Sequence, residues 1–135
     1  MAEAKAATQS VLEGFLVSGR FPDDRPLAAG DGIEAHGSAE LAARCRIHTA
    51  APASAADWLP ALLSLARPGD YVALLAYLHR TPGRHLQLQR LREALRDGTR
   101  LATTLGYGPR YLHSTGQLHK GGPDSGIFLQ LTAEP

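Results

Sequence analysis

Cysteine is almost absent from this chain, because Cys45 is the only one among its 135 residues. A single cysteine can neither form an internal disulfide nor begin a cysteine zinc cage, so the fold depends on its hydrophobic core. A length of 135 residues is the common size of one domain, and it suffices to bury such a core without disulfides or metals. We therefore expect one main domain in a reducing, cytoplasmic setting.

An excess of one charge is also missing, since 14 Lys and Arg residues oppose 13 Asp and Glu residues. The balance disfavours a nucleic-acid-binding protein driven by a basic field, and equally an acidic disordered chain. The longest apolar run, residues 71–78, is far too short to span a membrane, and the N-terminus has no apolar signal core. We expect a soluble protein whose partners are neither nucleic acids nor membranes.

The first part of the sequence differs in pattern from the rest. Apolar residues at helical spacing predict a helix over residues 8–16. Residues 20–32 are rich in proline, glycine and aspartate, and they are predicted as a loop. We therefore divide the chain into an N-terminal helix and loop, residues 1–31, and an α/β domain, residues 32–135.

Strands and helices alternate from residue 32 onward. The run 71–78 is apolar without alternation, which is typical of a strand covered on both faces in a parallel sheet. Such an order indicates an open, mostly parallel sheet with right-handed crossovers. The predicted fold class is α/β, with three layers and helices flanking the sheet. The predicted strands are 32–36, 71–78, 101–105 and 126–131, and the predicted helices between them are 38–46, 54–66, 82–98 and 110–120.

The turn at residues 105–110 is the most informative junction for chemistry. Ligands of open α/β sheets bind beyond the carboxyl ends of strands, where helices begin. Gly106 and Gly108 let the backbone turn sharply and expose its N–H groups, and Pro109 is placed to open the next helix. The positive end of that helix favours an anion at the same point. The alternative, that these glycines serve only the turn, stays open.

The helix predicted after this turn is unusually polar. His113, Gln117 and Lys120 stand at i, i+4 and i+7, so a continuous helix places them on one face. Ser114 and Thr115 lie between them. Clustered polar groups suit a carbohydrate or phosphate ligand, although a solvent-facing polar helix remains the alternative. No histidine or cysteine spacing matches a zinc site, so we expect no metal.

Residues 102–123 read ATTLGYGPRYLHSTGQLHKGGP. This run resembles the C-terminal part of the glucose-6-phosphate isomerase portion of bacterial bifunctional transaldolase/glucose-6-phosphate isomerase proteins. The resemblance covers residues 67–133 and, more weakly, residues 32–46. It implies a sugar isomerase (SIS) domain with a flavodoxin-like parallel sheet. It also implies interconversion of glucose 6-phosphate and fructose 6-phosphate through a cis-enediol, with no metal or organic cofactor.

The resemblance also implies roles for individual residues. Other members of the family carry the signature Gln-x-Gly-Val-Glu-x-x-Lys, whose lysine falls on Lys120, whose glutamate falls on Gln117 and whose first glutamine falls on His113. These three are the expected catalytic residues, and Lys120 would assist ring opening and stabilise charge developing on the sugar oxygen. The expected substrate-binding residues are Gly106, Tyr107, Gly108, Arg110, Ser114 and Thr115.

Two parts of such an isomerase have no match here, the phosphate loop and the segment with the glutamate base. Enediol chemistry needs a base at the C1–C2 protons, and Glu34, Glu40 and Glu93 have no context that marks them as that base. We therefore expect an isomerase-type domain that is incomplete as a lone chain and that joins a second copy or a missing isomerase/transaldolase segment. The alternatives are a non-catalytic module that binds a phosphorylated sugar, and a regulatory or oligomerising domain that pairs through helix 8–16.

Overall fold

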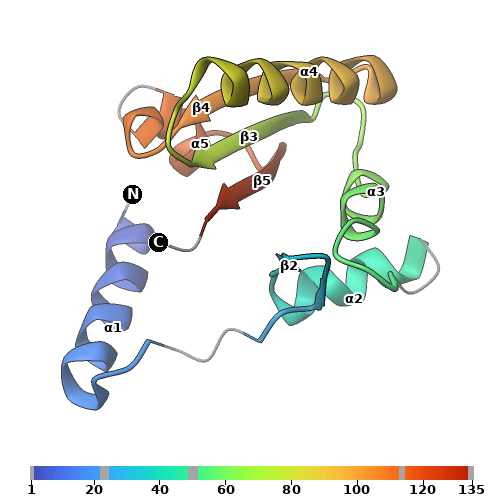
Figure 1. Ribbon diagram of the computed structural model, residues 1–135. Coiled ribbons are helices and arrows are strands. Elements are labelled where there is room, and N and C mark those ends of the chain that lie inside the picture. Colours follow the sequence, from blue (N-terminus) through green and yellow to red (C-terminus); the bar gives the residue numbers. More distant parts are fainter. Residues whose placement is uncertain (1, 22–24, 49–51, 113–114, 134–135) are drawn as a thin grey trace. The chain divides into compact units, whose positions relative to one another are not determined.

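The computed structural model describes residues 2–21, 25–48, 52–112 and 115–133 (Figure 1). The chain divides into two compact units, Met1–Leu65 and Ala66–Pro135, and each is described by itself. Every helix in the described ranges is too short or too polar to cross a membrane.

The first unit begins with helix α1 (Ala2–Ser18), which confirms the predicted N-terminal helix. It ends at Gly19, whose φ of +68° is in the left-handed region that suits glycine at a helix terminus. The amide of Gly19 still donates to the Phe15 carbonyl at 2.7 Å. Apolar side chains on α1, among them Leu12 and Leu16, are exposed.

A short hairpin follows α1 and corrects two predictions. Strand β1 (Ala28–Gly30) lies within the segment predicted as loop, and it pairs antiparallel with β2 (Ile33–Ala35). The strand predicted over residues 32–36 therefore does not join a parallel sheet. The reason is the Asp31-Gly32 turn, in which both residues have positive φ, 53° and 72°. An Asp-Gly pair with these angles is the preferred two-residue hairpin turn.

Helices α2 (Ala39–His48) and α3 (Trp58–Leu63) complete the first unit. The Ser38 side chain caps α2, since the amide of Leu41 donates to the Ser38 hydroxyl at 3.1 Å. Cys45 is 1% exposed, as expected for a buried small hydrophobe, and burial raises its pKa. The small core of this unit consists of Ala42, Cys45, Trp58 and Ala61.

The second unit is built on a three-stranded parallel sheet in the order β4-β3-β5. Its strands are β3 (Tyr71–Tyr77), β4 (Ala102–Tyr107) and β5 (Gly126–Thr132). The apolar run of β3 is central, and all five residues from Val72 to Ala76 are buried. The prediction of a mixed α/β protein with a parallel sheet is confirmed for this unit.

Helices contact both faces of this sheet, because successive side chains of a strand point to opposite faces. Helix α4 (Pro82–Thr99) lies along one face, where its His85 meets Tyr107 (Figure 1). The 3-10 helix η1 (Arg110–Leu112) and helix α5 (Thr115–Gly121) lie on the other face. There Tyr111 packs on Gly106, and His119 stacks on Tyr71.

Helix α4 begins at the predicted residue, but its C-terminal end differs from the predicted one. Pro82 is the first helical residue, as the predicted range 82–98 has it, and the Thr81 hydroxyl caps the helix by accepting from the amide of Arg84 at 3.2 Å. The predicted helix ends at Gly98, but α4 continues to Thr99. Its last turn closes through Arg100, which adopts a φ of 61° and donates its amide to the carbonyl of Arg96 at 2.8 Å.

The single helix predicted over residues 110–120 is wrong. The structure has η1 first and then α5, which begins at Thr115. His113 and Ser114 lie outside the described residues. The predicted face shared by His113, Gln117 and Lys120 required an unbroken helix, so the spacing argument for it no longer holds.

Candidate functional site

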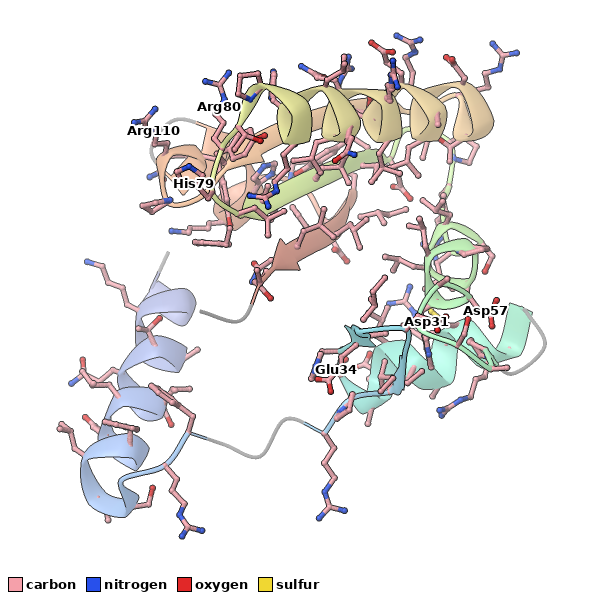
Figure 2. The ribbon with its side chains drawn as sticks, viewed as in Figure 1. Asp31, Glu34, Asp57, His79, Arg80 and Arg110 are labelled. Atoms are coloured by element: carbon pink, nitrogen blue, oxygen red, sulfur yellow. The ribbon has the colours of Figure 1, made fainter. Side chains whose placement is uncertain are left out.

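The carboxyl edge of the parallel sheet brings two loops together. Strand β3 leads into α4 through His79 and Arg80, and β4 leads into η1 at Arg110. The ends of the two strands are neighbours, since Ala76 pairs in register with Tyr107. Figure 2 shows His79, Arg80 and Arg110 at the same end of this unit. This edge is therefore basic, and it is the edge at which ligands of parallel sheets bind.

The two glycines of the turn are accounted for by packing. A Cβ atom at Gly106 would lie 2.7 Å from the Cβ atom of Tyr111, and one at Gly108 would collide with the ring of Tyr77. The amide of Gly108 donates to the Ala76 carbonyl at 2.9 Å, so it is not available to a ligand. These contacts favour the alternative in which the glycines serve the turn.

The two tyrosines that cover these glycines also interact with each other. The rings of Tyr77 and Tyr111 meet edge to face, with 5.8 Å between their centroids. Burial, together with the hydrogen bond to Tyr77, raises the pKa of Tyr111 to about 12. Tyr111 therefore remains protonated at neutral pH and acts there as a packing and hydrogen-bonding group.

Tyr107 lies on the α4 face of the sheet and meets two polar residues. Its hydroxyl is 3.3 Å from Nδ1 of His85, and the Arg80 guanidinium lies 5.7 Å from the centre of its ring. Among the predicted substrate-binding residues, Tyr107 and Arg110 lie at the basic edge. Arg110 is exposed at the start of η1.

A cavity of about 400 Å³ opens beside the first turns of α4, and this size is typical of small-molecule sites. None of its lining residues is acidic. The sequence analysis missed this site, although an Arg and a His directly after a buried strand were a usable signal. The cavity is lined by Arg80, Thr81, Pro82, His85, Leu86 and Gln89.

Helix α5 places the other predicted residues differently. Gly116 is buried and His119 is half-buried, so these two residues lie on the inner face of α5. Gln117 and Lys120 are exposed and lie on its outer face. Nδ1 of His119 lies 2.9 Å from the hydroxyl of Tyr71, the first residue of β3. Lys120 is therefore at the amino edge of the sheet.

The two edges are well separated. The rise of a strand puts the level of Tyr71 roughly 16 Å from that of Ala76, which adjoins the basic edge. Among the described residues, no hydrogen bond or ion pair joins Lys120 to Tyr107 or Arg110, although the ring of its neighbour His119 lies 6.5 Å from the ring of Tyr111. Of the remaining predicted residues, Thr115 begins α5, while His113 and Ser114 are outside the described residues.

Of the carboxylates considered as a general base, Glu93 belongs to the unit that holds the cavity but does not line it, and Glu34 and Glu40 belong to the first unit. Glu34 belongs to the first unit, where its Oε2 lies 3.1 Å from Nε2 of His36. Glu40 is exposed in the first turn of α2. Glu93 is on α4, 3.6 Å from the guanidinium of Arg92. Within the described ranges, no three His, Cys, Asp or Glu side chains form a group able to hold a metal ion.

Comparisons of the chain with family models, with curated proteins and with solved structures give no match. The chain is a mixed α/β protein whose second unit carries a three-stranded parallel sheet. The resemblance to the sugar isomerase family therefore stays a prediction.

Proposed function

We propose that residues 66–135 form a sugar-phosphate-binding domain of the SIS type, which binds a phosphorylated sugar such as fructose 6-phosphate. The charge at the carboxyl edge carries the proposal, because His79, Arg80 and Arg110 gather there (Figure 2). Guanidinium groups bind phosphate through paired, charge-assisted hydrogen bonds. The remaining polar groups of the cavity suit sugar hydroxyls.

The topology of the sheet supports the same edge. Strand β3 is central, and the chain crosses from it to β4 on one side and then from β4 to β5 on the other. The helices that follow β3 and β4 contact opposite faces of the sheet, so the loops at the carboxyl ends of these two strands diverge. Such a reversal of strand order is where ligands of open α/β sheets bind.

The positions of the carboxylates favour binding over turnover. Enediol chemistry needs a base within hydrogen-bond reach of the C1–C2 protons. Asp70 accepts the amide of Arg67 in the turn before β3, and Asp124 precedes β5, so both belong to the amino edge. Glu93 and Asp97 lie beside arginines on α4. We infer that the base comes from a second copy or from an isomerase or transaldolase segment.

Calorimetric titration tests the binding function. Fructose 6-phosphate and glucose 6-phosphate are each added to the full chain, with fructose and inorganic phosphate as the matched controls. We expect the phosphorylated sugars to bind and fructose to show no heat. Equal affinity for fructose, or no binding of either sugar phosphate, contradicts the proposal.

A coupled assay of fructose 6-phosphate isomerisation tests whether the chain acts alone. We expect no turnover by the wild-type chain or by Lys120→Ala. Exposed side chains contribute little to folding, so the variant should remain as stable as the wild type within about 0.5 kcal/mol. Turnover that requires Lys120 would establish a complete isomerase site and direct the search for its base to Glu34, Glu40 and Glu93.

A further inference from the structure

We infer that the cavity beside α4 is the phosphate subsite of this domain, with Arg80 as its anionic anchor. The inference rests on the proposed function, and it moves the phosphate away from the glycine turn expected from the sequence. The turn cannot offer the amide of Gly108, which is bonded to Ala76. The cavity, in contrast, has four side chains able to donate hydrogen bonds among its six lining residues, and it has no carboxylate.

Arg80 supplies the positive charge. Its guanidinium lies over the ring of Tyr107, at 5.7 Å from the ring centre, which is within the range of a cation–π contact. No side chain of the described residues forms an ion pair with Arg80. Its N–H groups are therefore available to the paired hydrogen bonds that a phosphate accepts.

His85 and Gln89 stand one helical turn apart on the same face of α4, and both line the cavity. Strand β4 orients His85 through the Tyr107 hydroxyl, which is 3.3 Å from Nδ1. The Nε2 atom of His85 then makes no hydrogen bond to the described residues and faces away from Tyr107. The cavity thus has an imidazole whose orientation is set before a ligand arrives.

Gln89 is oriented by a longer chain of contacts. Nε of Arg92 donates to Oε1 of Gln89 at 2.7 Å, and Nη1 of Arg92 donates to the Thr103 hydroxyl at 3.4 Å. Because its oxygen is occupied, Gln89 has its amide NH₂ left as a donor. Arg92 is therefore a positioning residue, and Gln89 presents a donor rather than an acceptor to the ligand.

Thr81 adds a fourth donor. Its hydroxyl oxygen accepts from the amide of Arg84 at 3.2 Å, which leaves the O–H hydrogen free to point elsewhere. A site made of a guanidinium, an imidazole, an amide and a hydroxyl matches a phosphate monoester with neighbouring hydroxyls. It offers no carboxylate for an amino sugar or a metal ion.

Titration of four variants tests the inference, with fructose 6-phosphate and inorganic phosphate as separate probes. Arg80→Gln should weaken fructose 6-phosphate binding about tenfold or more, since it removes a charge-assisted contact. Gln89→Leu should weaken it about fivefold. Arg90→Gln, on the exposed side of α4, is the matched charge control and should bind as the wild type does. Thermal unfolding of each variant checks that it is folded.

The variant Arg110→Gln distinguishes phosphate binding in the cavity from phosphate binding at the glycine turn. If this variant loses fructose 6-phosphate while Arg80→Gln retains it, the phosphate lies at the turn, and the inference is overturned with the proposed function intact. If inorganic phosphate binds to the wild type but not to Arg80→Gln, and sugar phosphates do not bind at all, the cavity is an anion site and the proposed function is contradicted. If neither probe binds the wild-type chain, both are overturned.

Discussion

The Cα atom of Gly106 lies directly beneath Tyr111, so that a Cβ atom at position 106 would come within 2.7 Å of the Tyr111 Cβ. Gly106 is half-buried near the end of β4, and Tyr111 begins the return of the chain over the same face. This contact holds η1 against the sheet. The packing of Tyr111 therefore explains the glycine at position 106 without any role in ligand binding.

Gly106→Ala should therefore destabilise the second unit by about 1–3 kcal/mol, since overpacking forces the backbone or Tyr111 to shift. Denaturant unfolding measures the change. Gly98→Ala is the matched control, because nothing lies within 4 Å of a Cβ at that helical position. This control should raise stability by up to about 1 kcal/mol, as alanine replaces glycine in a helix. Equal effects of the two variants would contradict the packing account.

Leu74→Ala should be more damaging, because Leu74 is 0% exposed at the centre of β3. Removing a buried leucine side chain costs about 2–5 kcal/mol through lost burial and the cavity left behind. Leu86→Ala is the comparison, since Leu86 is 53% exposed on α4. A loss below about 1 kcal/mol for Leu74→Ala would mean that β3 is not the core of this unit.

The sequence predicted the elements whose signals are local and strong. The unbroken apolar run of β3 required cover on both faces, and the Thr81-Pro82 pair marked the start of α4. The Asp31-Gly32 hairpin signal is also local, but the segment before it has the proline and glycine content of a loop. The composition therefore hides β1, the partner of β2, and the predicted place of β2 in the parallel sheet is wrong.

The site was harder to predict than the fold. Spacing along a helix indicates a shared face only if the helix is continuous, and here a 3-10 helix, η1, and a separate α-helix, α5, take the place of the single predicted helix. The position of Lys120 depends on the contact of His119 with Tyr71, 48 residues earlier in the chain. Long-range contacts of this kind leave no periodic trace in one sequence.

Asp57 gives the first unit an acid-sensitive contact. Its Oδ2 accepts from the hydroxyl and the amide of Ser54, at 2.9 and 2.8 Å, and from the amide of Ala53. The Ser54 hydroxyl is the main cause that lowers the pKa of Asp57. A carboxyl with a lowered folded pKa stabilises the fold above its ordinary pKa, and this contribution is lost as pH falls through the folded value.

Ser54→Ala should therefore raise the pKa of Asp57 toward its ordinary value, which an NMR titration of the carboxyl carbon measures. Asp57→Asn should reduce the dependence of unfolding free energy on pH in the acidic range where that carboxyl titrates. Ser64→Ala is a serine control whose hydroxyl bonds to the Ala61 carbonyl instead. An unchanged Asp57 titration in Ser54→Ala would show that the amides alone hold the carboxylate.

Tyr71→Phe tests whether the amino edge serves the fold or the ligand. Burial raises the pKa of Tyr71, so its hydroxyl stays protonated, and it is hydrogen-bonded to Nδ1 of His119 at 2.9 Å. Losing this bond should cost about 1 kcal/mol of stability. Because the basic cavity is at the opposite edge, the Kd for fructose 6-phosphate should stay within about twofold of the wild-type value.

The same Tyr71→Phe protein is measured by denaturant unfolding and by calorimetric titration, so the two readouts are compared in one sample. His119 also stacks on Tyr71 and meets Phe128 edge to face, and both ring contacts survive the substitution. The variant therefore keeps α5 on the sheet while removing one hydrogen bond. A marked loss of fructose 6-phosphate affinity without a loss of stability would place α5 in the ligand site. That result would restore Lys120 and Gln117 to the roles that the resemblance implies.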